Sequence, residues 1–246
     1  MQKYLFGKES VLPNQKTTLV QDLFSRVSSN YDRMNDCMSF GLHRIWKKRL
    51  IREINPFHLD FPILDMAGGT GDISISLLKK GYINLTVADL NEEMMIVGQD
   101  RIINEGYSSN SIIWKCENAE KLTLDSEHFH YYIIAFGIRN VTHIKDSLYE
   151  AYRVLRPTGK FICMEFNNAI DNKILNFLYQ HYSDYIIPML GHYIANDMEA
   201  YNYLVESIRQ FYSVADFIAL MESVGFRQIK NYQLGGGIVS LYVGYK

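Results

Sequence analysis

Cysteine is scarce in this sequence of 246 residues, which contains Cys37, Cys116 and Cys163 and no others. The three cysteines lie far apart, and an odd, dispersed set provides neither a disulfide framework nor the close ligand spacing of a zinc site. We therefore expect a protein of a reducing compartment, and we expect no bound metal.

An excess of charge of one sign is also absent. The 25 Lys and Arg residues nearly balance the 27 Asp and Glu residues, which leaves a net charge of −2 and argues against binding nucleic acid through a general basic surface. No apolar run approaches the ~18 residues of a membrane-spanning helix. Residues 1–16 lack both the apolar centre of a secretion signal and the Arg of a transit peptide, so we expect a soluble intracellular protein.

Short apolar runs alternate with helical patterns through the middle of the chain. The runs predict strands over residues 61–66, 85–88, 112–116, 130–136 and 160–166, and the patterns between them predict helices over residues 72–80, 91–105 and 145–155. Strand followed by helix, repeated, indicates parallel pairing with crossover helices. Because the expected strands are apolar on both faces, helices should cover both sides of an α/β sheet.

The C-terminal part adds an antiparallel end to this sheet. Ser213 and Asp216 resemble a capping box before a helical stripe, and Gly225 stands where a glycine ends a helix. Residues 226–233 and 238–245 are apolar runs joined by three glycines, which predicts an antiparallel hairpin at the sheet edge.

Helical patterns outside the sheet predict two additions to one domain of residues 1–246. An N-terminal helical cap is expected over residues 1–58, with helices near 17–30 and 42–53, and a helical insertion is expected over residues 171–210. Such additions usually cover the crevice at the carboxyl ends of the strands, where we expect the substrate.

A glycine-rich loop follows the first expected strand. Residues 65–72, DMAGGTGD, place three glycines within four residues, and glycine lets the backbone turn tightly and approach a ligand. The dinucleotide pattern of three spaced glycines fails, because its last position, counted from Gly69, is Ser74. That failure disfavours a nicotinamide oxidoreductase. The structural alternative for this loop is a plain strand-to-helix turn that binds no ligand.

The second expected strand ends in Asp89, 18 residues after Gly71. A carboxylate at this position can accept hydrogen bonds from both hydroxyls of an adenosine ribose. The loop and Asp89 together therefore indicate nucleoside binding without a pyrophosphate turn.

The loop and this acid resemble those of class I S-adenosylmethionine-dependent methyltransferases. The resemblance implies their Rossmann-like sheet and S-adenosylmethionine as cofactor. The cofactor-binding residues that it implies are Gly68, Thr70, Gly71 and Asp89, with Asn118 and Ala119 beside the adenine. Asn118 stands where Asp is usual in the family, and its amide oxygen can still accept a hydrogen bond from the adenine amino group.

Two longer strings narrow the class. Residues 31–46 (YDRMNDCMSFGLHRIW) and 153–166 (RVLRPTGKFICMEF) resemble the two signatures of the quinone-biosynthesis C-methyltransferases, the UbiE/COQ5 family. Residues 136–141 and 201–208 are similar to that family as well, although Thr158 replaces its usual Gly. With these four motifs in order, the chain is identified as a member of this family from about residue 24 onward.

The resemblance implies methyl transfer to a ring carbon of a polyprenylated hydroquinone. A phenol hydroxyl has a pKa near ~10 by analogy with tyrosine, so the site must favour the phenolate and align the ring carbon with the methyl group. We expect Arg139 to stabilise the phenolate, since a guanidinium keeps its proton. Tyr31 and Asn140 are expected to orient the quinol oxygens.

Each catalytic assignment has a structural alternative. Arg139 can instead close its loop through a salt bridge, and Tyr31 can be a buried ring with one hydrogen bond. His43 and His143 are candidate proton acceptors because imidazole titrates in the useful range. A lone His near a loop is more often structural, so neither is assigned to the site.

The sequence leaves other functions, partners and locations open. A methyltransferase of another small phenol or polyketide, or a non-catalytic scaffold of a quinone-synthesis complex, would share part of the pattern. The polyprenylated quinol implies peripheral contact with a bilayer, and a homodimer is an open alternative. The bacterial cytoplasm, at the inner membrane, is the expected location, with the mitochondrial matrix as alternative. The head group, benzoquinol or naphthoquinol, is undetermined.

Overall fold

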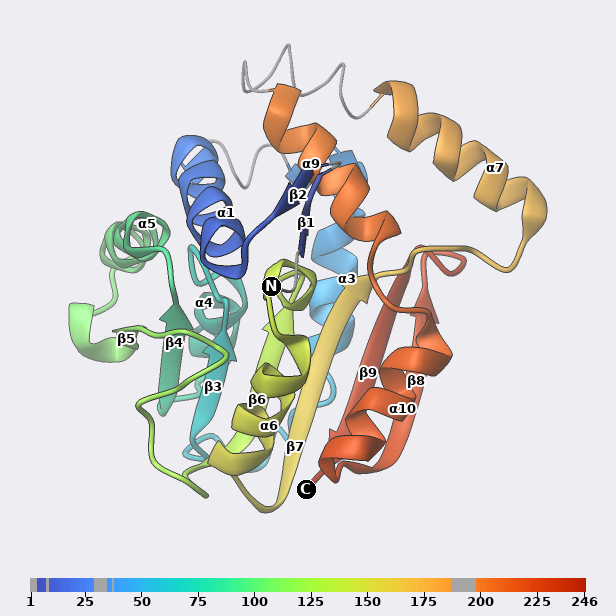
Figure 1. Cartoon of the computed structure of the whole chain (residues 1–246). Helices are drawn as coiled ribbons and strands as arrows, with labels where there is room; N and C mark the ends of the chain where they lie inside the picture. The colour runs from blue at the N-terminus through green and yellow to red at the C-terminus, as the bar shows by residue number, and fades with distance from the viewer. Residues whose placement is uncertain (1–3, 8, 29–34, 37, 187–197) are drawn as a thin grey trace.

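A central sheet of seven strands organises the protein in this computed structural model, which describes residues 4–7, 9–28, 35–36, 38–186 and 198–246. The strand order is β5-β4-β3-β6-β7-β9-β8 (Figure 1). The strands are β3 (Ile63–Met66), β4 (Leu85–Asp89), β5 (Ile113–Cys116), β6 (Phe129–Ala135), β7 (Leu155–Phe166), β8 (Arg227–Leu234) and β9 (Val239–Tyr245). The pairs from β5 to β7 are parallel, and β9 is antiparallel to both β7 and β8. The expected fold class is thereby confirmed.

Side chains of each central strand alternate between two cores, one on each face of the sheet. In β3, Leu64 packs into one core and Ile63 into the other, and in β6 Tyr132 and Ile133 divide in the same way. Because successive side chains of a strand point to opposite faces, an apolar strand needs helices on both sides.

Helices cover both faces of the sheet. On one face pack α6 (Ile144–Val154) and α10 (Val214–Val224), and on the other pack α3 (Leu42–Ile51), α4 (Asp72–Leu78) and α5 (Glu92–Asn104). Helix α10 begins where the sequence predicts, since Ser213 Oγ accepts a hydrogen bond from the Asp216 amide, and it ends at Gly225 in the left-handed conformation.

A third group of elements lies across the carboxyl ends of the strands (Figure 1). It contains α1 (Pro13–Val27), α7 (Lys173–His181), a π-helical turn (Tyr182–Ile186) and α9 (Met198–Arg209). Phe6, Leu23, Val27, Tyr201 and Tyr203 form a small separate core between the N-terminal segment, α1 and α9. The described parts of the expected cap, β1 and α1, therefore pack on α9 of the expected insertion, over the expected substrate crevice.

Two features differ from the sequence expectations. A hairpin of β1 (Tyr4–Phe6) and β2 (Glu9–Val11) precedes α1, where no strand was expected, because three-residue strands leave too short a pattern to detect. Strand β7 starts at Leu155, five residues early, and bulges before pairing of Lys160 with Tyr131 resumes. Thr158 in this bulge has a φ of 65°, a conformation that glycine adopts more easily.

Candidate functional site

The glycine-rich loop is a tight left-handed turn between β3 and α4. Ala67, Gly69 and Gly71 have φ values of 52°, 53° and 71°. A Cβ atom on Gly71 would lie 2.6 Å from Cη2 of Trp114, so this position excludes any side chain. Gly71 thus packs against the Trp114 indole, while Gly68 and Thr70 face an open cavity.

Asp65 fastens this loop to the helix that follows it. Its Oδ2 accepts hydrogen bonds from the Ser74 amide at 3.2 Å and from Ser74 Oγ at 2.8 Å. Burial raises the pKa of the Asp65 carboxyl to about 6, and the bonds from Ser74 oppose that increase. Asp65 therefore holds the end of β3 to the first turn of α4 and so stabilises the loop between them.

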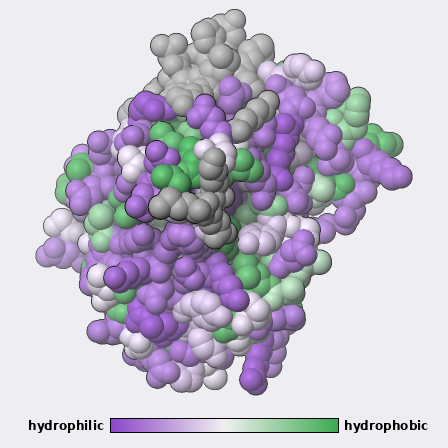
Figure 2. All heavy atoms as spheres, viewed as in Figure 1, coloured by the Kyte–Doolittle hydropathy of each residue, from purple (hydrophilic) through white to green (hydrophobic). Residues whose placement is uncertain are grey.

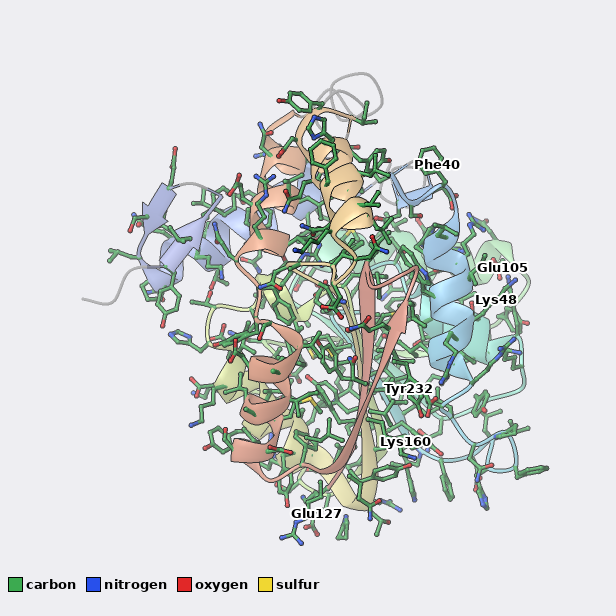
Figure 3. The ribbon with its side chains drawn as sticks, turned by 90° about the vertical axis from the view of Figure 1, so that its right-hand side faces the viewer. Phe40, Lys48, Glu105, Glu127, Lys160 and Tyr232 are labelled. Carbon is green, nitrogen blue, oxygen red and sulfur yellow. The ribbon has the colours of Figure 1, made fainter. Side chains whose placement is uncertain are left out.

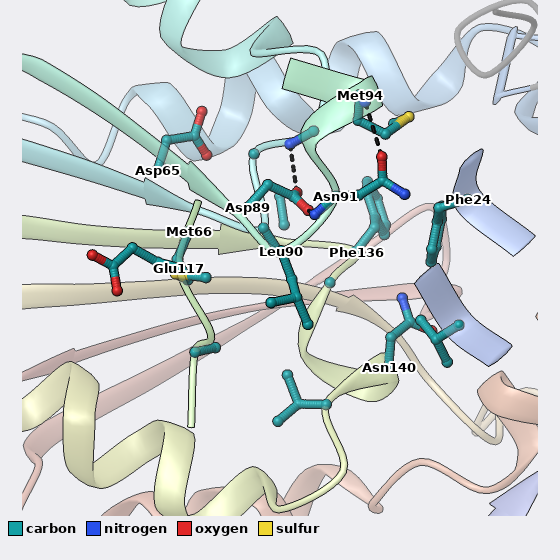
Figure 4. A pocket seen from close by; sticks show the side chains of 18 of the residues that line it. Phe24, Asp65, Met66, Asp89, Leu90, Asn91, Met94, Glu117, Phe136 and Asn140 are labelled. Atoms are coloured by element: carbon teal, nitrogen blue, oxygen red, sulfur yellow. Dashed lines mark hydrogen bonds between the residues drawn. The ribbon is translucent and has the colours of Figure 1, made fainter. Parts of the chain in front are cut away.

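Asp89 sits at the carboxyl end of β4 beside the loop. Its Oδ2 accepts a hydrogen bond from the Gly69 amide at 2.8 Å (Figure 4). Its Oδ1 accepts one from the Asn91 amide at 2.9 Å. Burial raises the pKa of this carboxyl, and the backbone bonds oppose the increase. Each carboxylate oxygen has a further lone pair, so the group can still accept from a vicinal diol.

The first cavity, called the loop cavity, encloses about 1100 Å³ including its open mouth. Leu90 and Val141 give this cavity an apolar surface. Five of the six expected cofactor residues also line it, namely Gly68, Thr70, Asp89, Asn118 and Ala119. Asn118 Oδ1 accepts from the Glu120 amide, which leaves one lone pair of that oxygen for an adenine amino group. A diol acceptor, an apolar slot and an amide thus fit the S-adenosylmethionine that the sequence implies.

The second cavity, called the apolar cavity, encloses about 1350 Å³ including its mouth. Elements α1, α3, α7 and α9 supply most of its walls, with residues that include Leu23, Met38, His43, Trp46, Leu175, Leu178, Tyr179, Tyr182, Tyr203 and Ile208. Phe24, Lys47 and Phe136 line both cavities, so the two meet at these side chains. An apolar molecule and a nucleoside can therefore contact each other there.

Arg139 lines the apolar cavity from the short 3-10 turn Ile138–Asn140 after β6. Its Nη1 donates to Glu165 Oε1 at 2.7 Å and to the Phe136 carbonyl at 2.6 Å, and its Nε donates to Ser207 Oγ at 3.3 Å. The side chains of Arg139 and Glu165 are 5% and 0% exposed. The salt bridge considered for Arg139 is thus present, and it fixes the guanidinium at the cavity wall.

Asn140 faces the loop cavity, next to Arg139 in the chain. Its Oδ1 accepts a hydrogen bond from the Tyr203 hydroxyl at 3.1 Å, which orients the amide from α9. Tyr31, the third expected catalytic residue, lies outside the described residues. The structure therefore brings Arg139 and Asn140 to the region where the cavities meet.

Several site residues escaped the sequence interpretation. Lys47 lines both cavities and pairs with Asp72 at 2.7 Å, Glu165 holds Arg139, and Tyr203 holds Asn140. In sequence, Glu165 is 26 positions from Arg139 and Tyr203 is 63 positions from Asn140. No local sequence pattern predicts such pairs, since a carboxylate in an apolar strand indicates only that it has some partner, and not which one.

A family profile and two relatives similar to this chain are methyltransferases of quinone biosynthesis. The profile of the ubiE/COQ5 methyltransferase family matches residues 11–246. The ubiquinone/menaquinone biosynthesis C-methyltransferase of Zymomonas mobilis is 47% identical, with all of both chains covered. The mitochondrial 2-methoxy-6-polyprenyl-1,4-benzoquinol methylase of Drosophila melanogaster is 40% identical over 98% of this chain and 84% of its own.

Solved structures agree on the fold. A SAM-dependent methyltransferase of Thermotoga maritima matches with a TM-score of 0.65 at 18% identity, over 92% of this chain and 98% of its own. A phosphoethanolamine N-methyltransferase of Haemonchus contortus, solved in complex with S-adenosyl-L-methionine, matches with a TM-score of 0.61 at 11% identity, over 82% of this chain and 52% of its own.

Proposed function

The chain belongs to the ubiE/COQ5 methyltransferase family, and from this membership we propose that it methylates a ring carbon of a polyprenylated quinol in ubiquinone or menaquinone biosynthesis. The methyl donor is S-adenosylmethionine. One observation carries the proposal: a nucleoside-type cavity built on Asp89 joins an apolar cavity walled by Arg139. Donor and acceptor would meet where Phe24, Lys47 and Phe136 line both.

We assign cofactor binding to the loop cavity. The Asp89 carboxylate would accept from the ribose hydroxyls, and Asn118 and Ala119 would flank the adenine. Gly68 and Thr70 would lie along the cofactor, while Gly71 supports the loop by letting Trp114 approach it. S-adenosylmethionine supplies an electrophilic methyl group when it is bound.

The chain's own residues would bind and polarise the quinol. Arg139 offers a fixed cation to the developing phenolate, because Glu165 and the Phe136 carbonyl hold its guanidinium in place. Asn140, held by Tyr203, would orient a quinol oxygen, and we keep the same assignment for Tyr31. The apolar walls exclude water, which would otherwise solvate and weaken the phenolate nucleophile.

Direct assay tests this function. Incubation with methyl-labelled S-adenosylmethionine and a short-tail demethylated quinol is expected to place the label on a ring carbon of the product, identified by mass spectrometry and NMR. Benzoquinol and naphthoquinol substrates tested in parallel would define the head group. Label on oxygen would favour the alternative phenol methyltransferase, and cofactor binding without turnover of any quinol would favour the scaffold.

We further propose that α7 contacts the surface of a bilayer, in bacteria the inner membrane. No helix among the described residues has the length and apolarity needed to cross a membrane. Helix α7 nevertheless exposes Ile174 (75%), Phe177 (58%) and Leu178 (58%), and apolar atoms gather at the upper right of Figure 2, where α7 lies. Leu178 also lines the apolar cavity, so a prenyl tail passing it would leave the cavity at this surface.

Phe40 extends this apolar surface at the start of α3. Its ring is 79% exposed, points away from the molecule in Figure 3, and lies 5.8 Å from the Tyr182 ring. Tyr182 directly follows α7 in the chain. An apolar surface beside a cavity for a lipid-soluble substrate is the arrangement that a peripheral membrane enzyme needs.

Acidic substitutions on α7 test the bilayer proposal. The double substitution Ile174→Asp and Phe177→Asp is expected to lower binding to liposomes at least ~10-fold in a sedimentation assay. The reason is that each of these two apolar side chains contributes ~1.5–3 kcal/mol when the bilayer buries it. Turnover of a short-tail quinol should be retained, since neither side chain lines a cavity. Ile83→Asp, at another exposed position, is the matched control. Equal liposome binding by the wild type, the double variant and the Ile83→Asp variant would contradict the proposal.

A further inference from the structure

His43 forms a buried pair with a carboxylate at the wall of the apolar cavity. It is the second residue of α3, its side chain is 6% exposed, and its Nε2 lies 2.8 Å from Asp36 Oδ1. Arg44 donates to both oxygens of the same carboxylate, at 2.6 Å each. This guanidinium holds the pKa of Asp36 well below its usual range, so the carboxylate is ionised.

The ionised carboxylate determines which nitrogen of His43 carries the proton. A carboxylate accepts hydrogen bonds and cannot donate them, so Nε2 must be the donor. A neutral imidazole has one N–H, and Nδ1 is therefore left with an unshared lone pair. Burial lowers the pKa of His43 against the opposing effect of Asp36, which keeps the ring neutral near pH 7.

Nδ1 of His43 is a buried acceptor that the protein leaves unused. The atom is inaccessible to solvent and has no hydrogen-bond partner among the described residues. Buried polar atoms are nearly always paired, and an exception at a cavity wall indicates a group that a ligand completes. The His43 ring lines the apolar cavity, whereas the Arg44 side chain is 62% exposed.

We propose that His43 is the general base of the methylation, with Asp36 as its positioning residue. Building on the proposed function, Nδ1 accepts the proton of the quinol hydroxyl once the side chains that bury this atom shift for the bound substrate. The ring carbon then uses the released electron density to form its bond to the methyl group. The bond from that methyl to sulfur breaks, and its electron pair stays on sulfur. On release from the cavity, the methylated ring loses the hydrogen of that carbon to bulk water as a proton and its oxygen takes up a proton, while the imidazolium returns its own proton to solvent.

Other ionisable groups around the apolar cavity do not compete for this role. Arg139 keeps its proton and already donates to Glu165, so it stabilises the phenolate while His43 takes the proton. Burial raises the pKa of Tyr179 and of Tyr203 to about 12, which makes both hydroxyls donors. Lys47, which also lines the cavity, lowers the pKa of His43.

His143 supplies a matched comparison within the same chain. It also pairs with a carboxylate, since its Nδ1 contacts Glu120 Oε2, but its side chain is 38% exposed. It lines neither cavity. His143 itself therefore lies outside both cavities, although its partner Glu120 lines the loop cavity. Loss of the His143 imidazole should leave methylation unchanged, whereas loss of the His43 imidazole should not.

Substitution of the two histidines separates these roles. His43→Gln is expected to reduce kcat at least ~100-fold near pH 7, the usual contribution of a general base, with unchanged cofactor affinity by calorimetry. Its residual rate should rise steadily with pH as the quinol ionises in solution, whereas the wild-type rate should fall on acidification as His43 gains a proton. Asp36→Asn should move that acidic limb, and His143→Gln should match the wild type. A folded His43→Gln enzyme with normal kcat would overturn the proposal.

Nitrogen NMR of the wild-type protein tests the same inference without turnover. With histidines labelled by ¹⁵N, His43 should show the tautomer protonated at Nε2, and a phenol whose ring positions are blocked should shift its Nδ1 resonance in the absence of cofactor. A proton on Nδ1 at pH 7, or no shift with a bound phenol, would contradict the role of His43. Failure of the wild type to methylate any quinol would instead contradict the proposed function.

Discussion

Replacing Arg139 by Ala is expected to lower the free energy of unfolding by about 3–5 kcal/mol, the cost of removing one partner of a buried ion pair. Glu165 is 0% exposed and loses its charged partner in this variant. Burial already raises the pKa of Glu165, and Arg139 is the main group that opposes this increase. Denaturant unfolding of the purified variant, compared with the wild type, measures the effect.

Loss of turnover in Arg139→Ala would therefore combine a weakened fold with a missing cation. The double variant Arg139→Met with Glu165→Gln separates the two, because an uncharged pair leaves no buried charge unpaired. We expect it to recover most of the stability, to bind S-adenosylmethionine normally, and to remain at least ~100-fold slower than the wild type, since charge stabilisation in the transition state is lost.

Two results would contradict this account of Arg139. A single Ala variant as stable as the wild type would show that the pair with Glu165 contributes little to folding. A double variant with normal turnover would remove Arg139 from the chemistry and leave it only the structural role of closing its loop through a salt bridge.

Replacing Asp89 by Ala is expected to weaken the binding of S-adenosylmethionine at least ~100-fold. Each hydrogen bond between a ribose hydroxyl and the carboxylate is worth about 1.5–3 kcal/mol, and two are lost. The Gly69 amide also loses its acceptor, which loosens the glycine loop. The fold should survive, because burial raises the pKa of Asp89 and removing the carboxylate relieves that desolvation. Calorimetric titration with the cofactor measures the change.

Two further variants complete the Asp89 experiment. Asp89→Asn keeps an acceptor for the Gly69 amide but loses the charge, so its affinity should fall between those of the wild type and the Ala variant. Asp60→Ala removes an exposed carboxylate that lines neither cavity and should bind normally. Unchanged affinity in Asp89→Ala would remove this carboxylate from the cofactor site.

Local patterns in the sequence were sufficient for most of the sheet. The expected strand over residues 85–88 is β4 (Leu85–Asp89), and the expected helix over residues 145–155 is α6 (Ile144–Val154). Such elements are readable because each forms an apolar stripe at the period of its own backbone. The β1–β2 hairpin and the early start of β7 were missed, since the first is too short for a period and the second contains a bulge.

The candidate site was predictable in its cofactor half and only partly in its substrate half. The glycine loop and Asp89 are close in sequence and follow consecutive strands, so the crossover rule brings them together. Arg139 and Asn140 were readable from their motif, but their partners Glu165 and Tyr203 were not. The role of Tyr31 stays a prediction.

The sequence by itself thus determined the repeated strand–helix unit of the sheet, the glycine-rich loop that indicates nucleoside binding, and the family. Each of these depends on residues that are near one another in the chain. Only the tertiary structure decided that Arg139 is held by a buried Glu165, that two cavities meet at Phe24, Lys47 and Phe136, and that His43 keeps an unused lone pair. The physical reason is that hydrogen-bond partners, and the side chains that exclude water from a group, are set by proximity in space. The composition of the sequence and the spacing of its residues do not contain that information.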